Sequence, residues 1–140
     1  MSRSSGRGVP VHAASFIRNR QIVLETQLLS HPSALRLIAV HEIFHFVWPR
    51  LGNAARAQYA ALLRVEMAHH ACGELGESAS FKKALLTPQR WRDYVCESFC
   101  DTAAWLYSGV KQHGEFTLAR RWREPRKAWF ERTFARPRQC

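Results

Sequence analysis

The order of apolar and polar residues along the chain predicts a short extended segment followed by several helices. Apolar and β-branched residues at 14–17 and 21–28 flank the polar triplet at 18–20, a pattern typical of a β-hairpin or small sheet. Beyond residue 30 the apolar positions recur with helical spacing, and this part of the chain carries helix start and stop signals. We expect helices at residues 32–48, 53–72, 80–86, 88–107 and 125–134.

Prolines and glycines set these expected helix boundaries. Pro32 and Pro88 suit the first position of a helix, because a proline there lacks only an N–H that would have no helical partner. Pro49 disfavours helical geometry in the residue before it, so the first helix should end there. Asn53 can cap the second helix, and Gly73 can end it. The whole pattern predicts an α+β fold that is dominated by helices.

Length and composition indicate one folded domain with two basic ends. The 140 residues are 46% hydrophobic and include five Trp and eight Phe, which is enough for a core. The net charge of +10 divides into +4 at residues 1–20, zero at 21–110 and +6 at 111–140. We therefore expect a disordered basic arm at 1–12, a folded domain at 13–110, and a basic, aromatic C-terminal segment at 111–140.

Several features argue against a membrane or secreted protein. The most apolar stretch, residues 35–48, is interrupted by charged and histidine side chains, so it is unsuited to span a bilayer. Residues 1–10 lack the apolar segment of a secretory signal. The four cysteines are too few for a disulfide scaffold and lack C-x-x-C spacing, so we expect them to be reduced. Cys96 and Cys100 lie four apart on an expected helix, where we expect buried apolar residues and, as the rarer alternative, soft metal ligands. Cytoplasmic residence follows as the expectation, and nothing in the sequence specifies an oligomeric state.

One short motif within the first expected helix carries recognisable chemistry. Residues 41–45 read His-Glu-Ile-Phe-His, which is the pattern H-E-x-x-H. Residues four apart lie on one helix face, so His41 and His45 can bind the same ion. Zinc lowers the pKa of a bound water toward about 7, and Glu42 can accept the proton of that water. The motif predicts a zinc-dependent hydrolase with Glu42 as general base.

A catalytic zinc site needs a third protein ligand and one open position. The metzincin pattern would require Gly at position 48 and His at position 51, where this chain has Trp48 and Leu51. Glu97 and Asp101 are better candidates, because they share one face of the helix at 88–107 and their apolar neighbours imply that both need partners. We expect Glu97 to bind zinc and Asp101 to accept the N–H of a ligating histidine.

His41-Glu42-x-x-His45, followed by a helix with Glu97-x-x-x-Asp101, resembles the gluzincin metallopeptidases, the thermolysin-like branch of the zincins, and by size the minigluzincins. Over residues 14–109 the resemblance implies a zincin-like fold and hydrolysis of peptide bonds. It assigns zinc binding to both histidines and Glu97, acid and base catalysis to Glu42, and support of a ligand to Asp101. The strand at 21–28 would form the rim of the cleft and pair with an extended peptide or protein substrate.

Larger gluzincins use a tyrosine or histidine to polarise the scissile carbonyl, and three residues here are candidates for that role: Tyr94, Tyr107 and His113. Glu66 and His70, which share a helix face, are interpreted as a surface ion pair or a polar helix end. The substrate remains open, since zinc, water and glutamate also suit other amides.

The basic ends leave further alternatives open. Residues 120–138 interleave basic and aromatic side chains, as nucleic-acid-binding segments do. The same segment could instead dock on the domain through its aromatic side, or cover the cleft of a latent enzyme. A non-catalytic, zinc-stapled nucleic-acid-binding protein is therefore the alternative from a different functional class, and it would need a fourth protein ligand on the metal.

Overall fold

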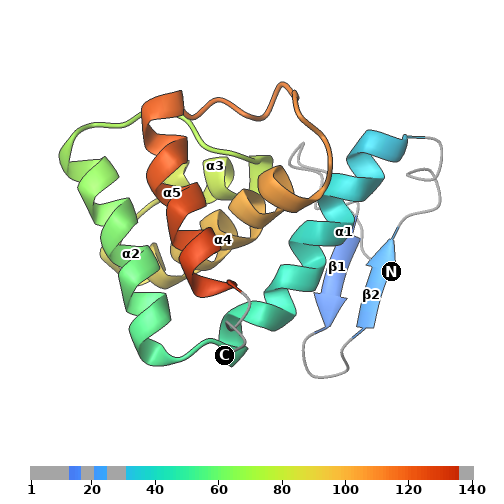
Figure 1. Ribbon diagram of the computed structural model, residues 1–140, viewed down its shortest axis with the longest axis horizontal. Coiled ribbons are helices and arrows are strands. Elements are labelled where there is room, and N and C mark those ends of the chain that lie inside the picture. Colours follow the sequence, from blue (N-terminus) through green and yellow to red (C-terminus); the bar gives the residue numbers. More distant parts are fainter. Residues whose placement is uncertain (1–12, 17–20, 25–30, 136–140) are drawn as a thin grey trace, which may run out of the picture.

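The computed structural model describes residues 13–16, 21–24 and 31–135, and its body is an assembly of helices (Figure 1). The helical elements of residues 31–135 are α1 (Pro32–Val47), η2 (Trp48–Arg50), α2 (Asn53–Ala68), α3 (Glu77–Ala84), η3 (Pro88–Arg90), α4 (Trp91–Tyr107) and α5 (Arg120–Thr133). Each of the five helices expected from the sequence overlaps one of the α-helices, with shifts at the boundaries.

Prolines and backbone conformation explain these boundaries. Pro32 occupies the first position of α1, and Pro88 begins the short η3 turn that leads into α4. α1 ends at Val47, just before the η2 turn that contains Pro49. α2 ends at Ala68 rather than near residue 72, because His70 and Gly73 adopt positive φ values of 55° and 88°, which an α-helix does not accommodate.

The α+β fold class expected from the sequence is wrong. Between residues 31 and 135 the structure contains no strand, and the helices pack on one another. Extended structure in the described residues is limited to β1 (Ala13–Phe16) and β2 (Gln21–Leu24), which pair antiparallel with Ala13 opposite Leu24 and with β1 beside α1 (Figure 1). Apolar and β-branched content indicates local extension, but two four-residue strands are too small to form a layer on which a domain is built.

α4 is the central element of the helical body. It contacts α1, α2, α3 and α5, and nine of its 17 residues are buried. Phe99 is fully buried and stacks on Phe130 of α5 with ring centroids 5.2 Å apart. The buried core cluster consists of Tyr59, Leu63, Ala79, Tyr94, Val95, Phe99, Cys100, Ala103, Trp129 and Phe130. α4 therefore holds its neighbours, including the helix with the H-E-x-x-H motif, in place.

The basic C-terminal segment contributes a helix to this core. α5 begins at Arg120, five residues before the expected start, and Pro125 lies inside it. Arg123 supports the additional turn by donating hydrogen bonds to the carbonyl oxygens of Leu118 and Phe116. Trp129 and Phe130 are 1% and 0% exposed, so the segment shares one hydrophobic core with α2 and α4.

A fully buried arginine joins α5 to the remainder of the fold. Arg126 donates two hydrogen bonds to Glu66 in α2, at 2.8 and 2.7 Å, and two to Glu74, at 3.0 and 3.2 Å. Tyr94 of α4 donates its hydroxyl proton to the same Glu74. Glu66 is 4% exposed and its ion-pair partner is Arg126, 60 residues further along the chain, so the interpretation of Glu66 and His70 as a surface ion pair is wrong.

Other expectations concern the membrane, the cysteines and the N-terminal arm. Among the described helices, none has the length and apolar character required to cross a membrane. Cys72, Cys96 and Cys100 are free thiols. The expected disordered arm at residues 1–12, and the part of the expected strand beyond Leu24, lie outside the described residues.

Candidate metal centre

Three potential metal ligands meet where α1 packs on α4. His41 and His45 lie one turn apart on α1, and their Nε2 atoms are 3.2 Å from each other. Glu97 of α4 faces both rings, with one carboxylate oxygen 3.1 Å from Nε2 of His41 and the other 3.3 Å from Nε2 of His45. We call these residues the His41–His45–Glu97 triad.

The geometry of the triad matches the ligand set of a zinc ion. Zinc bonds to nitrogen and oxygen are about 2.0 to 2.1 Å long, so two ligand atoms of a tetrahedral site lie about 3.3 Å apart. In the triad, the two Nε2 atoms are 3.2 Å apart, one Glu97 oxygen lies 3.1 Å from Nε2 of His41, and the other lies 3.3 Å from Nε2 of His45. In the described part of the chain, no fourth His, Cys, Asp or Glu completes the group. Two imidazoles and one carboxylate with an open position are typical of a catalytic zinc site.

Asp101 fixes the orientation of His41. Its Oδ1 atom accepts a hydrogen bond of 2.7 Å from Nδ1 of His41, which leaves Nε2 free to face the other members of the triad. The second oxygen of Asp101 accepts the backbone N–H of Ala79, in the first turn of α3, at 2.8 Å. The carboxylate also packs so closely on Gly76 that a Cβ atom there would overlap it. α1, α3 and α4 are thereby joined at one side chain.

The charged neighbours shift the pKa values of the triad in the metal-free protein. Burial alone would lower the pKa of His41, but hydrogen bonds to Asp101 and Glu97 outweigh it and raise the pKa to about 10. For His45, burial is likewise outweighed by hydrogen bonds to Cys96 and Glu97, and the pKa is also raised to about 10. Burial would raise the pKa of Glu97, but hydrogen bonds from the two histidines lower it to about 2.

Glu42 adjoins the triad along α1. It follows His41 directly in the helix and is 8% exposed, as is His41 itself. Consecutive helical residues are rotated by about 100°, so Glu42 flanks the face that carries the two histidines. A largely buried carboxylate in this position is suited to exchange protons with water beside the open side of the triad.

Within the described residues, none of the three candidates for polarising a carbonyl forms a hydrogen bond or a ring contact with a member of the triad. Tyr94 is 1% exposed and donates its hydroxyl proton to Glu74, which belongs to the buried arginine network formed by Arg126, Glu66 and Glu74. Burial, and secondly the negative charge of Glu74, raise the pKa of Tyr94. Tyr107 stacks on Phe44 with ring centroids 5.6 Å apart. Nδ1 of His113 accepts the backbone N–H of Glu115. None of these contacts supports the role that the sequence suggested.

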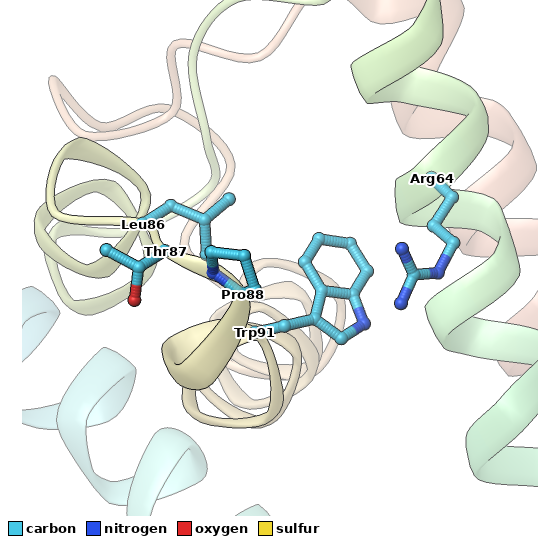
Figure 2. A pocket seen from close by; sticks show the side chains of 5 residues that line it. All are labelled: Arg64, Leu86, Thr87, Pro88 and Trp91. Atoms are coloured by element: carbon cyan, nitrogen blue, oxygen red, sulfur yellow. The ribbon is translucent and has the colours of Figure 1, made fainter.

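A separate surface pocket of about 370 Å³ lies between α2, η3 and the start of α4 (Figure 2). The guanidinium of Arg64 lies over the ring of Trp91 at 4.3 Å from its centroid, a cation–π contact. The other residues that line the pocket are Leu86, Thr87 and Pro88. No member of the triad lines it, and its residues offer no acid, base or metal ligand set.

A second group of ligand atoms lies beside the triad, and the sequence analysis did not foresee that His45 belongs to it. Cys96 and Cys100, interpreted as buried apolar residues, lie with His45 so that one ligand atom from each falls within 4.8 Å of the others. The sequence contains a sign of this group, because Cys96 directly precedes the expected ligand Glu97 and Cys100 lies one helical turn after Cys96. Only the position of α1 reveals that a histidine faces these thiols.

Comparisons of the chain with protein-family models, with curated proteins and with solved structures found no match. The chemistry assigned to the triad therefore rests on its residues and their geometry.

Proposed function

We propose that this protein is a zinc-dependent hydrolase that cleaves peptide bonds. The observation that carries the proposal is the convergence of three ligands: Nε2 of His41 and Nε2 of His45 are 3.2 Å apart, and each lies 3.1 or 3.3 Å from a different oxygen of the Glu97 carboxylate. Borderline ions such as zinc favour this mixture of imidazole and carboxylate ligands, whereas magnesium and calcium favour oxygen ligands alone.

Each residue of the centre has a distinct task in this proposal. A zinc ion held by the triad would lower the pKa of a water molecule and polarise a substrate carbonyl. Glu42 accepts the proton that the attacking water loses and delivers it to the leaving nitrogen. Asp101 accepts the Nδ1 proton of His41, which fixes the tautomer whose Nε2 atom can bind metal and raises the basicity of the ring.

The resemblance to gluzincins suggests a peptide substrate, and the strand pair beside α1 is compatible with it. β1 lies beside α1 and pairs on its other side with β2, in the order α1, β1, β2 (Figure 1). An extended peptide could add to an edge of this ribbon by backbone hydrogen bonds. The absence of a fourth ligand among the described residues favours catalysis over a purely structural zinc site, which is normally closed by four protein ligands.

The test combines metal analysis with an unbiased peptide-cleavage profile. Protein purified without added metal should contain about one zinc per chain and cleave peptides. Glu42→Gln should retain the zinc and lose hydrolysis by about 100-fold or more, because an amide does not accept the proton. Glu124→Gln, on the exposed side of α5, is the matched control and should retain activity.

Three results would contradict the proposal. One is stoichiometric zinc that persists in His41→Ala, which would place the metal elsewhere. Another is full activity in Glu42→Gln. The third is zinc binding without cleavage of any peptide, accompanied by hydrolysis of a different amide or by salt-sensitive binding of nucleic acid, which would favour the corresponding alternative.

A further inference from the structure

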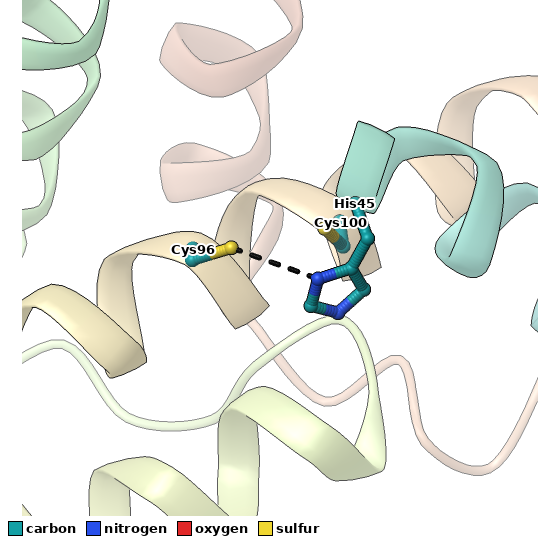
Figure 3. Close-up of side chains that lie close together, drawn as sticks. All are labelled: His45, Cys96 and Cys100. Atoms are coloured by element: carbon teal, nitrogen blue, oxygen red, sulfur yellow. Dashed lines mark hydrogen bonds between the residues drawn. The ribbon is translucent and has the colours of Figure 1, made fainter. Parts of the chain in front are cut away.

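The ring of His45 offers two nitrogens, and only Nε2 takes part in the triad. The other, Nδ1, lies 3.9 Å from the sulfur of Cys96. Cys100, one turn further along α4, completes a group of three ligand atoms that all lie within 4.8 Å of one another. The two cysteines come from α4, and the histidine ring reaches them from α1 (Figure 3).

This environment differs from that of the neighbouring histidine. Nδ1 of His41 donates to the carboxylate of Asp101, the type of partner that ordinarily orients a metal-binding histidine. Nδ1 of His45 instead faces a thiol. Cys100 is fully buried while Cys96 is partly exposed, so the group can be reached from the side of Cys96.

We propose that His45, Cys96 and Cys100 form a second cation site that takes a thiophilic ion, of the class to which Cd²⁺ and Cu⁺ belong. Two sulfurs and one imidazole are the ligands that soft cations select. At the bond lengths of zinc, about 2.3 Å to sulfur and about 2.0 Å to nitrogen, the two ligand atoms lie about 3.5 to 3.7 Å apart, and the larger Cd²⁺ ion holds them further apart. The observed 3.9 Å between Nδ1 and Cys96 needs only a small adjustment to reach this distance.

The shared ring makes the second site antagonistic to the first. A neutral imidazole has one nitrogen with a free lone pair and one that carries a proton. An ion on Nδ1 of His45 therefore takes the lone pair that a zinc ion on Nε2 would need, unless the ring loses its remaining proton. We expect a thiophilic ion to bind more weakly to the zinc-loaded protein than to the zinc-free protein.

Cadmium provides a test that does not depend on hydrolysis. The parent for the test carries Cys72→Ser and Cys140→Ser, so that any thiolate-to-cadmium absorption in the ultraviolet arises from Cys96 and Cys100. The zinc-free parent should take up Cd²⁺ with this absorption. Glu97→Ala, made in the same parent, should keep the absorption because it removes only a ligand of the triad. In this variant, about one equivalent of Cd²⁺ should be enough to produce the full absorption.

Loss of one thiol should weaken cadmium binding and lower the absorption per bound ion to about half or less, and loss of both should abolish the absorption. Cys96→Ser is the primary variant, because this residue is partly exposed and its replacement should leave the helices intact, as circular dichroism can verify. Cys100→Ala preserves an apolar side chain in the core and should give the same loss. The proposal is overturned by a parent that lacks the absorption, or by full absorption with unchanged cadmium affinity in either folded variant.

Two comparisons complete the test. Cadmium affinity should fall at least about tenfold when the parent is first loaded with zinc, and equal affinities would refute the shared ring. The two proposals fail in different ways. If the proposed hydrolase function is wrong but the second site exists, the protein shows no zinc-dependent peptide cleavage and still develops the cadmium absorption.

Discussion

His41 and His45 bind protons more strongly than isolated histidines do, and the same nitrogens are needed for metal. Both pKa values are raised to about 10 in the metal-free protein. Burial would lower them, but hydrogen bonds to Asp101 and Glu97 for His41, and to Cys96 and Glu97 for His45, outweigh this effect. Because zinc binds the deprotonated imidazole, protons and zinc compete for the triad. The competition weakens as the pH rises toward the pKa.

Zinc affinity should therefore increase with pH across the neutral range. Each proton displaced by the metal contributes about a tenfold change in apparent affinity per pH unit, so displacement of one to two protons predicts about a 10- to 100-fold increase per unit between about pH 6 and about pH 8. Competition with a chelator of known pH dependence would measure this slope. A flat profile would mean that zinc displaces no proton from these histidines.

The connection between α2 and α3 links the metal centre to the buried arginine network. Glu74 in this segment binds Arg126, and Gly76, two residues later, packs against Asp101. The φ angle of Gly76 is 179°, an extended conformation that any residue can adopt. Glycine is needed here because the carboxylate of Asp101 occupies the space of a side chain.

Gly76→Ala should therefore weaken zinc binding without touching a ligand. The added methyl group would displace Asp101 from Nδ1 of His41, and loss of such support reduces metal affinity by about 10- to 100-fold. Gly114→Ala is the control, because a Cβ atom at Gly114 meets nothing within 4 Å. Unchanged zinc affinity in Gly76→Ala, measured by chelator competition, would show that Asp101 does not support the triad.

α5 is attached to the body by charge as well as by apolar contacts. Arg126→Ala would leave the carboxylates of Glu66 and Glu74 buried without their guanidinium partner, at a cost of about 3 to 5 kcal/mol in the free energy of unfolding. Lys127→Ala, the exposed neighbouring residue, should change it by less than about 0.5 kcal/mol. Denaturant unfolding of both variants measures the difference, and similar values would contradict the structural role of this network.

Removal of the C-terminal segment should prevent stable folding of the remaining chain. A protein that ends at Val110 lacks Trp129 and Phe130, and each such buried aromatic contributes about 1.5 to 3 kcal/mol. The truncation also exposes the apolar side chains of α2 and α4 that Trp129 and Phe130 cover in the full chain. Thermal unfolding and light scattering should reveal a lower melting temperature or aggregation. A soluble, equally stable truncation would instead favour polyanion binding or latency as the role of the segment.

Two phenylalanines, one in α5 and one just after it, allow the contribution of the segment to be tested by single substitutions rather than by truncation. Phe130 is fully buried and Phe134 is 37% exposed. Phe130→Ala should cost about 3 to 5 kcal/mol, whereas Phe134→Ala should cost distinctly less because much of its ring already contacts water.

Much of the fold could be predicted from local patterns, although some boundaries could not. The prolines at 32, 49 and 88 mark the ends of α1 and the approach to α4. The start of α5 was misplaced because Pro125 appeared to begin a helix, whereas hydrogen bonds from Arg123 support one more turn before it. The α+β class is wrong because apolar and β-branched content does not reveal how many strands assemble, or whether helices pack on them.

The sequence by itself determined what depends on spacing within one helix. His41 and His45 share a face of α1, and Glu42 flanks it, because helical rotation places residues four apart together. Tertiary structure decided every pairing between distant elements. Cys96 meets His45 across 51 residues, and Arg126 meets Glu66 across 60. Such contacts depend on how α1 and α5 pack against their neighbours, which no local pattern specifies, so only the folded chain reveals the thiol group beside the triad and the buried arginine network.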